Sequence, residues 1–203
     1  MEITKKINNE NCIFFDVDTQ HDYLSANSSK SIKNSADIRK NLLKLTVYAV
    51  ENNIKIIGSV DVHHNTTQLR NKIQETFVQG TIFVPNIKVS EQIISKALQT
   101  NLPVLVEKQA YSCFQNPNMD VIVKKIIEKN INQAVVYGVA TEYCVKEAVL
   151  GLLSRGIKVL LVRDAIGAIN HALGEEALKE MKEAGAALIE AEEFANPIKI
   201  INA

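Results

Sequence analysis

The sequence predicts an α/β protein: a three-layer α/β/α fold around a mostly parallel six-stranded sheet. Apolar segments of strand length recur along the chain, and segments with the apolar spacing of helices lie between them. The apolar segments are continuous rather than alternating, as is typical of strands buried on both faces of a parallel sheet. Their alternation with helices favours right-handed crossovers between parallel strands.

The expected elements follow in order along the chain. The strands are CIFFDV (12–17), IKIIGSV (54–60), PVLVE (103–107), AVVYGV (134–139), IKVLLV (157–162) and AALIE (186–190). Helical spacing marks 36–51, 90–99, 119–129, 143–154 and 174–184. The stretch 62–86 is the least regular, and its NTTQ and QGT sections indicate a loop. Because no repeat or Pro/Gly-rich linker divides the chain, we expect residues 1–203 to form a single domain.

The composition is that of an ordinary globular protein, with 46% hydrophobic and 23% charged residues. Lys+Arg and Asp+Glu are both 23, so no net charge favours a nucleic acid or an anionic membrane as partner. No apolar run approaches the roughly 18 residues of a membrane span, and the polar start MEITKKINNE does not resemble a secretory signal. The three cysteines lack a disulfide-like or zinc-like spacing, which predicts a reducing, cytoplasmic location.

Three polar residues follow three of the expected strands. Asp18 comes directly after the first strand, Lys108 directly after PVLVE, and Cys144 after AVVYGV and the turn ATEY. In an open parallel sheet ligands bind at the carboxyl ends of the strands, so we expect these side chains to meet there. Each residue taken alone more often has a packing, capping or solvated role, and only their joint placement indicates function.

This combination suits nucleophilic catalysis. A cysteine at the start of a helix has its thiolate stabilised by backbone N–H groups and the helix dipole, and a lysine nearby stabilises it further. An aspartate can take the thiol proton and later return it to a leaving amine. Backbone N–H groups of the turn 139–144 can hold the oxyanion of a tetrahedral intermediate.

The stretch FFDVDTQHDYL (14–24) also permits a second interpretation. Its Asp16-Val17-Asp18-Thr19 resembles the DxDxT loop of haloacid-dehalogenase-type phosphatases, with Asp16 as nucleophile and Mg²⁺ as cofactor. Such a site needs a downstream acidic pair, and DAIGAINHA after Asp164 supplies no second carboxylate. This interpretation also leaves Cys144 unexplained. Asp18 is therefore the favoured catalytic carboxylate, and we expect Asp16 to be structural.

Four blocks of the sequence carry a family resemblance. VDTQHDY (17–23), SVDVHH (59–64), EKQAYSCFQNPN (107–118) and VVYGVATEYCVKEAVLGLLSRG (135–156) resemble, in order and spacing, the nicotinamidase branch of the isochorismatase-like cysteine hydrolases. DAIGAIN (164–170) continues the resemblance, which covers roughly residues 12–194. The last long block is the most specific of the four.

The resemblance implies a catalytic triad of Asp18, Lys108 and Cys144. It also implies a cis peptide before Ala140, which would place the N–H groups of Ala140 and Cys144 in an oxyanion hole. Enzymes of this family hydrolyse small carboxamides through a thioester and release ammonia, and nicotinamide is the substrate best known for them. Tyr23 and Phe114 match aromatic positions that line the family's substrate pocket, and family members commonly form homo-oligomers.

The resemblance also concerns a metal site, at which this sequence departs from the family. Nicotinamidases hold a divalent metal with an Asp-x-His pair and two further histidines, and Asp61 and His63 match the pair. In IQETFVQGT (73–81), Thr76 stands at a histidine position and Ile73 at that of a ring-stacking tryptophan. Two protein ligands rarely hold a metal firmly, so the sequence leaves open whether zinc, manganese or iron is bound.

Alternative functions therefore remain beside nicotinamide hydrolysis. A related amidase acting on another small amide or carbamoyl compound would use the same triad. A non-catalytic family member that binds a metabolite would explain the altered metal site, although it gives no reason for Asp18, Lys108 and Cys144 to occur together. The phosphatase is the least favoured of these alternatives.

Overall fold

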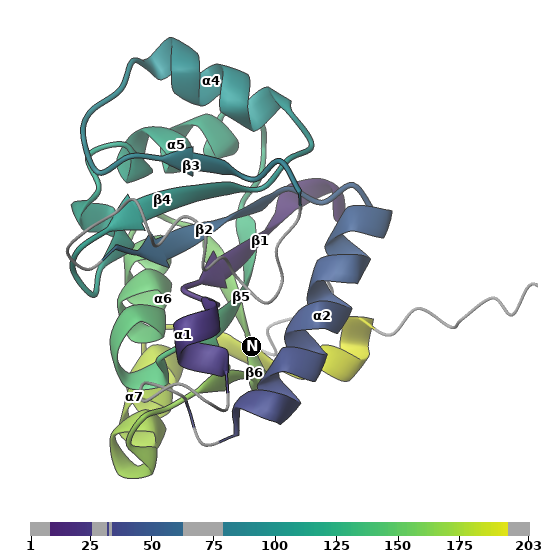
Figure 1. Ribbon diagram of the computed structural model, residues 1–203, viewed down its shortest axis with the longest axis vertical. Helices are drawn as coiled ribbons and strands as arrows, with labels where there is room; N and C mark the ends of the chain where they lie inside the picture. The colour runs from purple at the N-terminus through teal and green to yellow at the C-terminus, as the bar shows by residue number, and fades with distance from the viewer. Residues whose placement is uncertain (1–8, 26–31, 33, 63–78, 195–203) are drawn as a thin grey trace, which may run out of the picture.

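The computed structural model describes residues 9–25, 32, 34–62 and 79–194. Its centre is a seven-stranded sheet in the order β3-β4-β2-β1-β5-β6-β7, and every pairing is parallel (Figure 1). The strands are β1 (Cys12–Val17), β2 (Ile56–Asp61), β3 (Ile82–Val84), β4 (Val104–Lys108), β5 (Gln133–Val139), β6 (Lys158–Gly167) and β7 (Ala187–Ile189).

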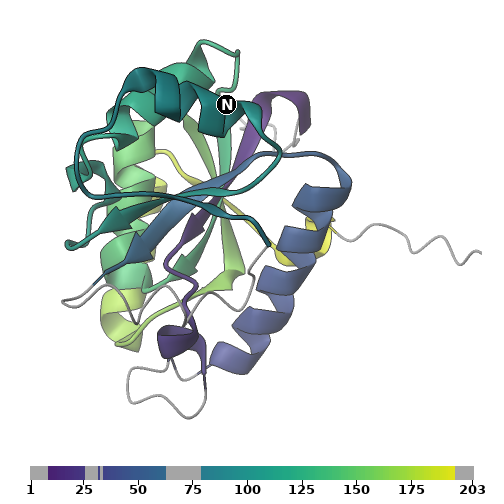
Figure 2. The same cartoon turned by 45° about the horizontal axis from the view of Figure 1, so that its top comes forward.

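Helices cover both faces of this sheet, and neighbouring strand residues are buried on opposite sides. Phe14 packs with residues of α2 (Ser35–Glu51), whereas Phe15 packs in the core shared with the other long helices. Those helices are α4 (Glu91–Gln99), α5 (Met119–Ile127), α6 (Lys146–Leu153) and α7 (His171–Glu183). Figures 1 and 2 show α2 on one side of the sheet and α5 to α7 on the other. The continuous apolar runs of the sequence are explained by this double burial.

The predicted fold class is confirmed, with one strand more than expected. All six expected strands form, and the seventh, β3, lies within the irregular stretch 62–86, where we expected no strand, directly after its QGT section. Its three residues pair with β4 at the edge of the sheet, with Ile82 opposite Val104. A three-residue apolar run gives too short a pattern to be distinguished from a loop.

The strand order brings the ends of the central strands together. From β1 the chain builds the sheet in one direction through β2, β4 and β3, and in the other through β5, β6 and β7. The reversal lies between β1 and β5, and a binding crevice is expected at the carboxyl ends of the strands at such a point. The ends of β4, β2, β1 and β5 are therefore neighbours at one edge.

Two glycines allow β1 to lie very close to both of its neighbours. A Cβ added to Gly58 in β2 would collide with the carbonyl oxygen of Asp16, and one added to Gly138 in β5 would collide with that of Val17. Gly138 also has a φ of +125°, in the region that favours glycine. Both positions therefore require glycine.

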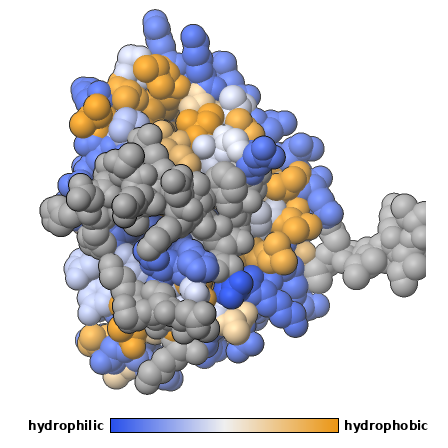
Figure 3. All heavy atoms as spheres, viewed as in Figure 1, coloured by the Kyte–Doolittle hydropathy of each residue, from blue (hydrophilic) through white to orange (hydrophobic). Residues whose placement is uncertain are grey.

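The surface of the described residues is mixed. Three apolar side chains of α2, Leu43, Val47 and Val50, are about half exposed along its outer face, and apolar atoms gather over this helix in Figure 3. In the described part of the chain, no helix is both long and apolar enough to cross a bilayer.

Candidate active site

Asp18, Lys108 and Cys144 form a continuous chain of contacts at the carboxyl ends of β1, β4 and β5. The Lys108 Nζ atom lies 2.7 Å from Asp18 Oδ2 and donates to Cys144 Sγ at 3.2 Å. It also donates to the carbonyl oxygen of Ala110 at 3.0 Å. Asp18 and Lys108 are each 1% exposed, and Cys144 is 9% exposed. The structure thus brings together the three residues that the sequence singled out.

Asp18 is held by β2 as well as by Lys108. Its backbone N–H donates to the carbonyl of Ser59 at 3.1 Å, and the Ser59 hydroxyl donates to Asp18 Oδ1 at 2.8 Å. Asp18 has a φ of 50°, in the left-handed region that residues other than glycine rarely adopt. This turn ends β1 and directs the carboxylate toward Lys108.

We expected Cys144 near the start of an α-helix over 143–154, but it lies in a separate turn that precedes the helix. Thr141–Val145 forms one π-helical turn, and α6 begins after it at Lys146. The peptide bond between Val139 and Ala140 is cis, as the family resemblance implies. The carbonyl of Ala140 accepts hydrogen bonds from the N–H groups of Tyr143 and Val145, each at 3.1 Å. The two residues expected to form the oxyanion hole, Ala140 and Cys144, therefore belong to one tightly bonded turn.

The surroundings of Cys144 favour the protonated thiol in the resting protein. Burial, followed by the nearby Asp18 carboxylate, raises the pKa of Cys144 to about 12, and the opposing effect of Lys108 is smaller. We had expected a stabilised thiolate, but desolvation of the anion outweighs the lysine. Burial lowers the pKa of Lys108, yet the Asp18 carboxylate, with a contribution from the thiolate form of Cys144, outweighs it and raises that pKa overall. A carboxyl group beside a protonated thiol is the arrangement that a general base needs.

A cavity of about 510 Å³ adjoins this triad. Asp61, which pairs with Lys108 in the sheet, and Ala110, whose carbonyl binds Lys108, both line it. The other lining residues are Gln109, Tyr111, Ser112, Gln115 and Glu147. None of the described lining residues is basic, so this part of the wall suits a neutral or positively charged group better than an anion.

The two aromatic residues expected in the substrate pocket differ in their placement. The Tyr23 hydroxyl donates to Asp61 Oδ2 at 2.7 Å, so Tyr23 contacts a residue of the cavity wall. Burial, followed by this hydrogen bond, raises the pKa of Tyr23, and the charges of Asp61 and then Asp18 contribute. The Phe114 ring instead lies against Gly151, with the Arg155 guanidinium 3.7 Å from the ring centroid.

The described residues alone do not complete a metal centre. Among them, no three His, Cys, Asp or Glu side chains come together as a metal site. Asp61, one of the two expected ligands, has Oδ2 bonded to Tyr23, and its backbone N–H and C=O are bonded to the Gln20 side chain at 2.7 and 3.0 Å. His63, the other expected ligand, lies outside the described residues, as do Ile73 and Thr76.

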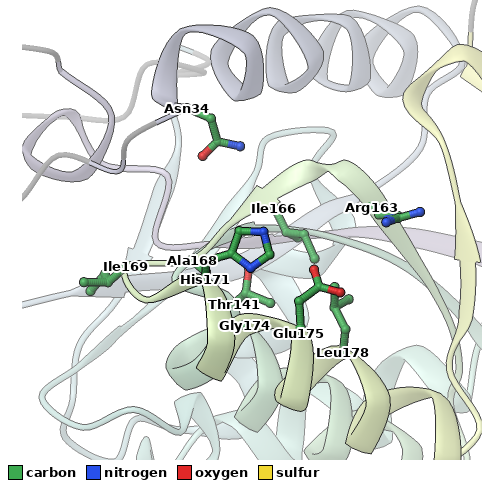
Figure 4. A pocket seen from close by; sticks show the side chains of 10 residues that line it. All are labelled: Asn34, Thr141, Arg163, Ile166, Ala168, Ile169, His171, Gly174, Glu175 and Leu178. Atoms are coloured by element: carbon green, nitrogen blue, oxygen red, sulfur yellow. The ribbon is translucent and has the colours of Figure 1, made fainter.

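A second cavity, of about 440 Å³, lies between α7, the end of β6 and the start of α2. In Figure 4, Asn34 faces it from the start of α2, while Glu175 and Leu178 come from α7. Its lining includes Thr141, from the turn that carries the nucleophile, and, like that of the first cavity, none of the three triad residues. The first cavity is the better candidate for a substrate because two of its lining residues, Asp61 and Ala110, are direct neighbours of Lys108.

Comparison with known protein families identifies the chain. The model of the isochorismatase domain matches residues 12–193. The chain belongs to the isochorismatase domain family. This membership supports a hydrolase with a cysteine nucleophile and removes the reason for a phosphatase interpretation of Asp16.

Solved structures agree with this isochorismatase fold at low sequence identity. The MAR1 ribonuclease of Caenorhabditis elegans is 22% identical with a TM-score of 0.62, covering 92% of this chain and 80% of that one. The YcaC gene product of Escherichia coli, an octameric hydrolase of unknown specificity, is 19% identical with a TM-score of 0.64 (94% and 80%). The nicotinamidase PncA of Bacillus subtilis is 20% identical with a TM-score of 0.65 (89% and 99%). No curated protein sequence matches this chain.

The structure adds residues to this isochorismatase-family site that the sequence analysis did not single out. The Ser59 hydroxyl holds the carboxylate of Asp18, and the Gln20 side chain holds the backbone of Asp61. Glu142 Oε1 accepts the N–H of Asn170 at 2.7 Å. All three lie in blocks that carry the family resemblance. Their hydrogen-bond partners are distant in sequence, so the blocks marked the region but not the contacts.

Proposed function

We propose that the protein is a cysteine amidohydrolase that converts a small carboxamide into the carboxylate and ammonia, with nicotinamide as the first candidate. The observation that carries the proposal is the buried Asp18–Lys108–Cys144 chain, with its contacts of 2.7 and 3.2 Å, beside an open cavity. An acidic cavity wall or a lone cysteine would not by itself indicate catalysis. A cysteine nucleophile with a carboxylate base and a lysine cation within reach does.

In the proposed reaction, Asp18 takes the thiol proton as Cys144 Sγ attacks the amide carbon. The carbonyl oxygen becomes an oxyanion held by the N–H groups of Ala140 and Cys144. The tetrahedral intermediate collapses, the C–N bond breaks, and Asp18 returns its proton to the nitrogen, which leaves as ammonia. Water then attacks the thioester with Asp18 as base, giving the carboxylic acid and the free thiol. Lys108 stabilises the anions of both neighbours throughout.

The cavity wall bears on the substrate class. Asp61 and Glu147 supply two carboxylates, and Gln109, Ser112 and Gln115 supply hydrogen-bonding groups. This wall supports a neutral amide over an anionic substrate, and it is compatible with a carbamoyl compound as well as with nicotinamide. Tyr23, bonded to Asp61, is proposed as part of the substrate pocket, and so is Phe114 from its match to the family.

The remaining properties are proposed on separate grounds. We propose Asp61 and His63 as the ligands of zinc, manganese or iron if a metal is bound, and no step of the proposed reaction depends on such a metal. A homo-oligomer is supported by the octameric E. coli relative. A cytoplasmic location is supported by the three free cysteines. We also propose that residues 1–203 act as one catalytic domain.

The experiment that tests this function is ammonia release from the purified protein with nicotinamide, before and after chelator treatment, with Cys144→Ala as control. Release that is lost in Cys144→Ala supports the amidohydrolase. Sensitivity to the chelator would indicate that a metal is needed, and insensitivity that the triad works without one. If a panel of small neutral amides and carbamoyl compounds also gives no ammonia, the protein is a binding member of the family instead.

A further inference from the structure

Ser59 contacts the carboxylate at the centre of the triad without belonging to the triad. It lies in β2, opposite Val17 of β1, and its side chain has no exposed surface. Its hydroxyl donates to Asp18 Oδ1 at 2.8 Å, while the other oxygen of the same carboxylate, Oδ2, lies 2.7 Å from Lys108 Nζ. Each carboxylate oxygen of Asp18 therefore has its own partner.

The backbone of Ser59 acts on Asp18 as well. Its carbonyl accepts the N–H of Asp18 at 3.1 Å, just where the chain leaves β1 with a φ of 50°. Ser59 thus accepts one hydrogen bond from the main chain of the proposed base and donates another to its side chain. Gly58, which precedes Ser59, allows this close approach because any side chain there would collide with Asp16.

A carboxylate held only by Lys108 would be free to rotate about χ2, since this terminal torsion has broad minima. Rotation through part of a turn would move the lone pairs relative to the thiol, and only a half-turn, which exchanges two equivalent oxygens, would restore the geometry. Catalytic groups lose activity steeply when they are displaced by even about 1 Å. With the Ser59 hydroxyl on one oxygen and the Lys108 ammonium on the other, this rotation is opposed and the plane of the carboxylate is held in one orientation.

We infer that Ser59 is a positioning residue, whose hydroxyl fixes the carboxylate of Asp18 in the orientation that accepts the Cys144 proton. The inference rests on the proposed role of Asp18 as base. It adds a fourth residue, outside the Asp-Lys-Cys set, on which the reactivity of the thiol depends.

The test compares Ser59→Ala, which removes the hydroxyl, with Ser59→Thr, which keeps it. Thr19→Val is the matched control, because the Thr19 hydroxyl is equally buried and donates at 3.1 Å to Asp16 instead of Asp18. The first measurement is the rate at which iodoacetamide alkylates Cys144 at one fixed pH, read by mass spectrometry of the Cys144 peptide. The second is kcat and KM for ammonia release, and thermal unfolding of each variant is the third.

Ser59→Ala is expected to slow alkylation about tenfold and to lower kcat about 10- to 100-fold with KM nearly unchanged, in the range of one general-base contribution. Ser59→Thr should recover most of the alkylation rate and most of kcat. Thr19→Val should keep the alkylation rate and kcat within about threefold of the wild-type values. An unchanged or faster alkylation in Ser59→Ala, or an equal loss in Thr19→Val, overturns the inference. If the alanine variant does not fold, the threonine variant decides: near-wild-type alkylation supports the role, and a tenfold loss overturns it.

Alkylation needs no substrate, so this readout stays informative even where ammonia release fails. Absence of ammonia release in the wild-type protein counts against the proposed function only. Loss of alkylation in Ser59→Ala with an unchanged unfolding temperature is a result that a merely structural serine would not give.

Discussion

Asp16 and Asp18 are two buried carboxylates, two residues apart, with different surroundings. Asp16 is 3% exposed within β1, and its Oδ2 accepts the Thr19 hydroxyl at 3.1 Å. Asp18 is 1% exposed just beyond the strand, and its carboxylate lies between the Ser59 hydroxyl and the Lys108 ammonium. In a continuing strand both would point to the same face. The positive φ of Asp18 breaks that equivalence, so the end of the strand decides which aspartate can meet a distant lysine and cysteine.

Removal of Cys144, the proposed nucleophile beside Asp18, is expected to have the largest effect on activity. Cys144→Ala should lower ammonia release by at least about 10³-fold, because the covalent route is lost altogether. Its thermal unfolding should stay close to wild type, since the substitution removes a single sulfur atom and leaves the rest of the turn unchanged. Substantial turnover in this variant would mean that another group attacks the substrate.

The comparison itself is tested by a pair of matched variants. Asp18→Asn should lower kcat about 10²- to 10⁴-fold, the usual contribution of a general base, and leave the Lys108 ammonium buried without its partner charge. Asp16→Asn should lower kcat less than about tenfold. Steady-state kinetics and thermal unfolding of both variants separate loss of chemistry from loss of fold. Equal losses of kcat at matched stability would contradict the division of roles.

The smallest effect concerns the pH dependence of thiol labelling. The pKa of Cys144 is raised from about 9 to about 12, so the neutral thiol persists to higher pH in the folded protein. The rate of alkylation by iodoacetamide should therefore keep rising well above pH 9, where an ordinary thiol approaches its plateau. The measurement is the initial rate between pH 7 and 10, with Cys144→Ala to subtract labelling of Cys12 and Cys113. A plateau below pH 9 would mean that the thiolate is stabilised at rest.

Much of the fold could be predicted from the sequence because both faces of the sheet are buried. Strand β1 begins and ends where the apolar run CIFFDV does, and four of the other expected strands agree within two residues at each end. The strand expected over 157–162 continues as β6 to Gly167, through the polar pair Arg163 and Asp164 at which the apolar run ends. β3 could not be predicted, because three apolar residues at an edge give no distinctive period. The triad was predictable for a related reason: each member follows a strand that was itself evident, and parallel strands end at one edge.

The supporting contacts could not be predicted in the same way. Ser59 is recognisable as a strand residue, but its register against Val17 depends on how β1 and β2 pair. The protonation state of the Cys144 thiol could not be predicted from the sequence either. Burial and the Asp18 charge together raise its pKa by more than Lys108 lowers it. Likewise, the hydroxyl that distinguishes Tyr23 from phenylalanine bonds to Asp61, a contact that only the folded chain reveals.

Gly58 and Gly138 have a consequence for any attempt to redirect this scaffold to new substrates. Each lies in a strand that pairs directly with β1, Gly58 in β2 and Gly138 in β5, and a methyl group at either would push β1 away from that strand. A library that varies Tyr111, Ser112, Gln115 and Glu147 alters the cavity wall while the strands keep their spacing. Libraries that include the two glycines should be depleted of folded, active members at those positions. Selection experiments on this protein would thus find tolerance in the segment that follows β4 and at Glu147 of α6, and near-invariance at two glycines that have no side chain to touch a substrate.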